Sequence, residues 1–163
     1  MKLVVMSLDD VEQGAIMDLQ DTMALDSTVA VVSVLDKAAM REARILCHRR
    51  SCVAIERFRF DDDDQGPNVI SPTDADRAVR FCLTMAAQNV TIMVVHCAAG
   101  IRRSAGMAAA FAIMLGQNDE QFFAPPYCHN MKVYHSLLNV WYRSLLKVWG
   151  QVVLERLQEK EVN

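Results

Sequence analysis

Residues 91–116 read TIMVVHCAAGIRRSAGMAAAFAIMLG, and the rest of the chain can be arranged around this stretch. Thr91 to Val95 is apolar and rich in β-branched residues, which predicts a buried strand. Ala105 to Leu115 is almost wholly apolar and rich in alanine, which predicts a buried helix. The order is therefore strand, tight loop and helix, with a thiol, Cys97, where the loop begins and a guanidinium, Arg103, where it ends.

Residues 97–103, here called the cysteine loop, have the composition of an anion site. A loop that leads into a helix leaves several backbone N–H groups without intrahelical partners, and with the helix dipole they form a cradle of phosphate size. Gly100 allows a crowded or left-handed turn, and a cysteine in such a cradle is expected to be acidic. Arg103 can hold two oxyanion oxygens with its fork, and Ser104 can donate a hydrogen bond to the thiolate. Together these groups predict phosphoryl transfer through a cysteinyl-phosphate.

The order His-Cys-x5-Arg-Ser, from His96 to Ser104, resembles the phosphate loop of cysteine-dependent protein tyrosine and dual-specificity phosphatases. The resemblance implies that Cys97 is the nucleophile, that Ser104 eases departure of the thiolate, and that His96 orients the loop by hydrogen bonding. No metal or cofactor is expected, because the cradle and the arginine supply the positive field. The expected substrate-binding groups are the backbone N–H groups of Ala98, Ala99, Gly100, Ile101, Arg102 and Arg103, with the Arg103 side chain.

Residues 61–68, here called the acidic loop, open with four aspartates in a row. One interpretation is a set of charges facing water; a calcium site is less consistent, because such loops space their acids at alternate positions. The third interpretation is a general acid for the leaving oxygen, with its pKa raised by the clustered charges. In the phosphatase family this acid follows a strand, some thirty-odd residues before the cysteine. Aligning the end of the preceding strand selects Asp62, with Asp61 and Asp63 as rivals.

The length and composition predict one catalytic domain over residues 1–163. A net charge of −3 argues against general nucleic-acid binding. No apolar run is long enough for a membrane span, and the opening MKLVVMSLDD has too few apolar residues for a signal peptide. A cytoplasmic location is expected, which also suits a catalytic thiolate, while the oligomeric state stays open.

The chain has five cysteines, so at least one is free, and their spacing with histidine fits no common zinc pattern. No metal site is therefore expected. Cys52 or Cys82 could protect an oxidised Cys97 by forming a disulfide, and the sequence leaves this open.

The pattern predicts an α/β fold with a central, mostly parallel sheet and helices on both faces, and the resemblance implies the compact dual-specificity type. The sequence Ser71-Pro72-Thr73-Asp74 is a strong signal for the start of a helix. Gly150 is expected to bend or split the last helix. The expected strands are residues 3–7, 28–35, 52–60 and 91–95, and the expected helices are residues 11–23, 37–46, 72–87, 105–115 and 129–160.

The resulting hypothesis is a phosphatase for phosphotyrosine, and for phosphoserine and phosphothreonine in a shallow pocket, on a phosphorylated protein or a small phosphomonoester. An alternative is an inositol phosphate or phosphoinositide phosphatase, because Arg102 adds a cation at the rim of the loop, although Arg102 also suits a surface salt bridge. A rhodanese-type sulfurtransferase would leave the acidic loop without a role. A non-catalytic phospho-binding module is the remaining class.

Overall fold

The computed structural model describes residues 1–24 and 26–161, with side chains described through residue 152. Its centre is a parallel sheet in the order β1-β4-β2-β3. The strands are β1 (Lys2–Met6), β2 (Val29–Leu35), β3 (Cys52–Arg59) and β4 (Ile92–His96). The predicted α/β fold is confirmed, and the described sheet is parallel throughout.

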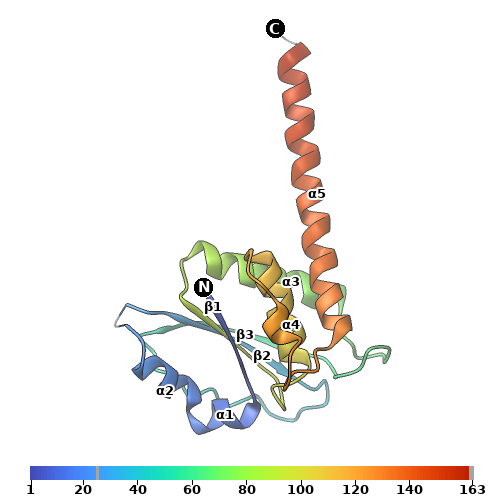
Figure 1. The fold of residues 1–163 in the computed structure, drawn as a ribbon. Coiled ribbons are helices and arrows are strands. Elements are labelled where there is room, and N and C mark those ends of the chain that lie inside the picture. Colours follow the sequence, from blue (N-terminus) through green and yellow to red (C-terminus); the bar gives the residue numbers. More distant parts are fainter. Residues whose placement is uncertain (25, 162–163) are drawn as a thin grey trace.

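Helices cover both faces of this sheet (Figure 1). The short helices α1 (Leu8–Gln13) and α2 (Ala15–Asp21) lie on one face, and α3 (Pro72–Ala87), α4 (Arg103–Met114) and α5 (Met131–Glu161) lie on the other. A single 3₁₀ turn, η1 (Glu120–Phe122), follows α4 among the described residues. Alternate residues of β2 pack into two separate cores, as expected for a strand buried on both sides.

The first predicted helix, residues 11–23, is divided into α1 and α2 and starts earlier than expected. Ser7 caps α1: its Oγ accepts from the Asp10 backbone N–H (3.1 Å), and the Asp10 carboxylate accepts from the Ser7 N–H (2.8 Å). Gly14 then takes φ +100°, which a helix interior cannot contain, so one helix ends and the next begins there.

The helix predicted over residues 37–46 is wrong, because this segment forms turns and irregular backbone. Side chains from other elements satisfy its backbone groups: Arg59 donates to the carbonyl oxygens of Ala39 (2.5 Å) and Arg41 (3.2 Å), and the Arg44 N–H donates to Glu12 (3.0 Å). These three peptide groups therefore find partners outside a helix.

The other helices follow the prediction closely, apart from one glycine. Ser71 caps α3, accepting from the Asp74 N–H at 3.0 Å. α5 runs through Gly150 unbroken for 31 residues, so the expected bend is absent. In Figure 1 the C-terminal part of α5 extends away from the sheet, and there Leu146 and Trp149 are 71% and 68% exposed. Among the described residues, no helix combines the length and apolarity needed to cross a membrane.

The carboxyl ends of the strands meet at one edge of the sheet, and this edge positions the candidate site. Met6 and Ser33 both pair with His96 in register, so β1, β2 and β4 end side by side. The cysteine loop leaves β4 at this edge and enters α4, in the strand, loop and helix order that the sequence predicts. Open α/β sheets place their ligands at such an edge.

Candidate active site

The backbone of the cysteine loop is fitted tightly against the end of β1. Gly100 has φ +70°, and a Cβ there would lie 2.7 Å from the Ser7 nitrogen and 2.8 Å from the Met6 carbonyl carbon. Only glycine meets both conditions. The Ala98 carbonyl oxygen also accepts from the Leu8 N–H at 3.0 Å, so this loop is held by the segment that begins α1.

Cys97 is buried, with 2% of its surface exposed, and its Sγ lies 3.1 Å from the Oγ of fully buried Ser104. Ser104 is the second residue of α4, so the sulfur stands at the N-terminus of a 12-residue helix. A thiolate there gains from the positive end of the helix dipole and from the hydroxyl hydrogen bond. The predicted pairing of these two side chains is therefore present.

Arg103 begins α4 and is 3% exposed. Its Nη1 donates to the Phe60 carbonyl oxygen at 2.8 Å and lies 2.7 Å from an Asp36 carboxylate oxygen. Asp36 and Phe60 directly follow β2 and β3, so the strand ends hold the guanidinium at the carboxyl edge. Its Nε is buried and has no hydrogen-bond partner among the described residues. Buried donors in native proteins are nearly always hydrogen-bonded, so this one is unusual.

His96 is completely buried, and neither of its ring nitrogens has a hydrogen-bond partner among the described residues. That His96 orients the loop by hydrogen bonding therefore stays a prediction. Burial lowers the pKa of His96 from 6.5 to about 4. The imidazole is thus buried and neutral at pH 7.

The first three aspartates of the acidic loop have three different environments. Asp61 accepts from the Lys37 backbone N–H (2.8 Å), which is the main cause of its lowered pKa. Asp63 accepts within its own turn, from the Gln65 N–H (3.0 Å). Asp62 is the one of the three that contacts the cysteine loop, through Arg102 (Nε to Oδ1, 3.1 Å).

Two side chains that the sequence analysis missed complete the site. Asp36 pairs with Arg103, and fully buried Asn130 donates from Nδ2 to Asp62 Oδ1 at 2.9 Å. Asn130 immediately precedes α5, and a polar residue before a helical pattern is a cap signal. That signal locates the residue but gives no indication that it meets the acidic loop.

Arg102 lies within ion-pair distance of Asp62 (3.1 Å) and Asp64 (3.8 Å). Its charge is therefore compensated by the acidic loop, as in the salt-bridge interpretation of this residue. The same contacts hold the acidic loop against the cysteine loop, although Asp62 and Arg102 are 40 residues apart in the sequence.

Cys52 lies too far along the sheet to bond Cys97. Cys52 pairs with Val29, which pairs with Ile92, and Cys97 follows Ile92 by five residues, or roughly 16 Å of strand. A disulfide needs Cα atoms within about 7 Å. Cys82 is fully buried in the same core as Cys97, and all five cysteines are free thiols. Among the described residues, no three histidine, cysteine or acidic side chains gather closely enough to hold a metal ion.

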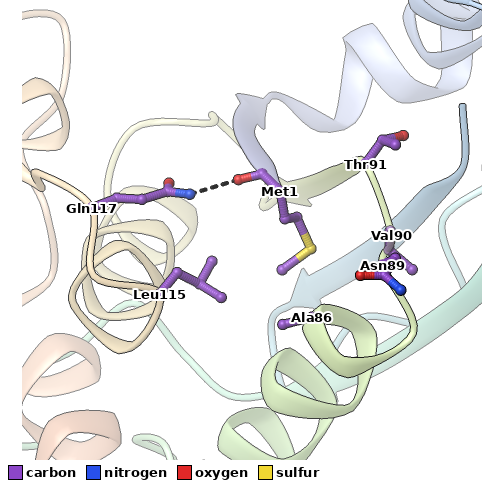
Figure 2. Close-up of a pocket in the computed structure, with 7 residues that line it drawn as sticks. All are labelled: Met1, Ala86, Asn89, Val90, Thr91, Leu115 and Gln117. Atoms are coloured by element: carbon purple, nitrogen blue, oxygen red, sulfur yellow. Dashed lines mark hydrogen bonds between the residues drawn. The ribbon is translucent and has the colours of Figure 1, made fainter.

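Two hollows lie at opposite ends of the sheet. One, of about 210 Å³, adjoins the cysteine loop and includes Leu8, Asp36, Met40 and Ala98 in its lining. The other, of about 340 Å³, lies at the amino ends of β1 and β4; Figure 2 shows it with a hydrogen bond from Gln117 to the Met1 carbonyl oxygen, 2.7 Å. The first hollow thus meets the cysteine loop at Ala98.

The chain resembles solved structures in fold. No protein-family model and no curated protein sequence matches it. Human DUSP28 superposes with a TM-score of 0.60 at 14% identity, covering 89% of this chain and 94% of that one. A human tyrosine phosphatase-like serine/threonine/tyrosine-interacting protein gives 0.58 at 15% identity, with 88% and 93% covered. PTPMT1 in complex with PI(5)P gives 0.53 at 17%, with 88% and 94% covered.

The fold is that of the compact dual-specificity phosphatases. At these identities the likeness concerns the arrangement of helices and strands, and the chemistry has to be argued from the residues of this chain.

Proposed function

We propose that residues 1–163 form one catalytic unit, a phosphatase that hydrolyses phosphomonoesters through a cysteinyl-phosphate. The observation that carries the proposal is the buried Cys97–Ser104 pair at the N-terminus of α4. Arg103 begins the same helix, and its guanidinium is held by Asp36 and Phe60 with an unpartnered Nε. A buried donor without a partner is accounted for when an oxyanion binds it.

In the first step, the Cys97 thiolate attacks phosphorus in line and the bond to the leaving oxygen breaks. The backbone N–H groups of residues 98–103 and the Arg103 fork stabilise the equatorial oxygens. Asp62 gives its proton to the leaving oxygen. In the second step, water gives a proton to Asp62 and attacks phosphorus, and the S–P bond breaks while Ser104 hydrogen-bonds the departing thiolate. These groups supply the positive field, so the proposal requires no metal or cofactor.

The proposed substrates are phosphotyrosine and, in view of the compact dual-specificity fold, phosphoserine and phosphothreonine. A phosphoinositide is the alternative, and PTPMT1, a structural neighbour, is described in complex with PI(5)P. The pairing of Arg102 with two aspartates argues against a free cation for extra phosphates at that position. A cytoplasmic location is proposed because the thiolate needs a reducing compartment.

Hydrolysis of 4-nitrophenyl phosphate by freshly reduced protein, with EDTA present, tests this proposal. We expect turnover by the unaltered protein and none by Cys97→Ser. Single Asp→Asn changes at positions 61, 62 and 63 then identify the acid: the change at 62 should lower kcat by about 10²–10⁴ on a substrate with a poor leaving group, and the other two much less. Tight phosphopeptide binding without turnover would instead support a phospho-binding module.

A further inference from the structure

Asn130 is a fully buried polar side chain that the mechanism above does not use. Its backbone N–H donates to the Arg102 carbonyl oxygen at 3.0 Å, and its carbonyl oxygen accepts from the Tyr134 N–H at 3.1 Å. Gly106 of α4 approaches so closely that a Cβ there would lie 2.6 Å from the Asn130 backbone carbonyl oxygen. The residue is therefore fixed between the end of the cysteine loop, α4 and the first turn of α5.

The side-chain amide of Asn130 uses its oxygen as an acceptor and its nitrogen as a donor, toward two different segments. Its Oδ1 accepts from the Val133 N–H at 3.0 Å and so caps α5. That bond requires the oxygen to face the helix, so Nδ2 must face the other way, where it donates to Asp62 Oδ1 at 2.9 Å. Aspartate could cap the helix equally well but could not donate to another carboxylate.

Both donors to Asp62 reach the same oxygen. Asn130 Nδ2 and Arg102 Nε each donate to Oδ1, and no described residue donates to Oδ2. Oδ2 is thus the oxygen that can carry a proton, while Oδ1 accepts in both protonation states. A carboxyl group held this way can lose and regain a proton in each cycle without changing its position.

We propose that Asn130 is a positioning residue for Asp62, its braced amide holding the acid over the cysteine loop with Oδ2 directed to the reacting group. Arg102 supports the same oxygen from the more exposed side. The inference rests on the proposed function, since it assigns a role to a residue that acts through the general acid.

Leaving-group dependence tests this role, because a good leaving group departs without a proton and a poor one does not. Kinetics on phenyl phosphate and on 2,4-dinitrophenyl phosphate would be compared for the unaltered protein, Asn130→Asp and Asn68→Ala. Asn130→Asp keeps the cap acceptor and removes the donor. Asn68 is the matched control, since its amide donates to Asp61 in the same loop (3.1 Å).

We expect Asn130→Asp to lower kcat on phenyl phosphate about 10-fold to 100-fold, part of the usual general-acid effect, and to change kcat on the dinitrophenyl ester by less than about 3-fold. Asn68→Ala should leave the ratio of the two rates unchanged. An equal loss on both substrates, or no loss on either, would overturn the proposal. If Asn130→Asp does not fold, the exposed change Arg102→Met should move the ratio in the same direction, and an unchanged ratio would count against the proposal.

Hydrogen exchange of the acidic loop separates this proposal from the proposed function. Exchange in residues 61–68 should be faster in Asn130→Asp than in the unaltered protein, whether or not either protein turns over substrate. Turnover by neither, with faster exchange in the variant, would reject the phosphatase and keep the positioning contact. Unchanged exchange would reject the contact itself.

Discussion

Acidification from pH 7 to pH 4.5 should destabilise the native protein by about 2 kcal/mol through His96. Burial lowers the pKa of His96 from 6.5 to about 4 in the folded state. The unfolded chain therefore binds the proton first, and stability falls as the pH drops from about 6.5 towards 4. A shift of about 2.5 pH units corresponds to roughly 3 kcal/mol when complete, of which about 2 kcal/mol is lost by pH 4.5.

Urea unfolding at pH 7 and pH 4.5, at constant ionic strength, measures this difference. His96→Asn is the comparison, because it removes the titration and keeps a polar side chain. The unaltered protein should lose about 2 kcal/mol more than the variant between the two pH values. Glu12 contributes in a lower window: the hydrogen bond from Arg41 lowers its pKa from 4.5 to about 2, so its contribution is lost as the pH falls through that range.

Parallel pH dependences of the two proteins would refute the reasoning, since they would mean that His96 binds its proton equally in both states. The ring resonances of His96 give an independent reading by NMR and should titrate near pH 4. A midpoint near 6.5 would contradict the burial argument directly.

Three further outcomes are expected. Gly100→Ala should lower the free energy of unfolding by about 1–3 kcal/mol from the left-handed backbone alone, with the backbone overlap added; an unchanged thermal midpoint would contradict this. Arg103→Lys keeps the charge beside Asp36 but loses the fork, so kcat should fall about 10²–10³-fold while the thermal midpoint stays near that of the unaltered protein. Steady-state kinetics and a thermal melt measure the two quantities, and an unchanged kcat would contradict the prediction. Burial raises the pKa of Cys82 to about 12, so native protein treated with iodoacetamide at pH 8 should be alkylated at exposed Cys128 and not at Cys82, as peptide mass mapping would determine.

Where the signal is local, the sequence predicts the structure well. α3 begins where its serine cap, proline and acidic first turn place it, because those groups act within one helical turn. The strand, loop and helix around Cys97 follow in the same way from β-branched and alanine-rich runs. The positive φ of Gly100 could be anticipated, whereas its contact with β1 could not, since that contact depends on how the strands pair.

The features that could not be predicted from the sequence depend on tertiary contacts. Residues 37–46 are irregular because Arg59 and Glu12, from distant elements, satisfy their backbone groups. Asn130 meets Asp62 across 68 residues, and no spacing rule connects two such positions. The contacts that distinguish Asp62 from Asp61 and Asp63 also depend on this packing, since the sequence surroundings of the three aspartates are nearly identical.

The most direct test of the central claim is to trap the covalent intermediate on Cys97. Reduced protein would be mixed with an excess of 2,4-dinitrophenyl phosphate, quenched in acid within milliseconds, digested and analysed by mass spectrometry. We expect one phosphoryl group on the peptide that contains Cys97, and none on that peptide from Cys97→Ser. Turnover of the ester with no phosphoryl group on Cys97 at any quench time, or a phosphoryl group on another residue, would contradict it.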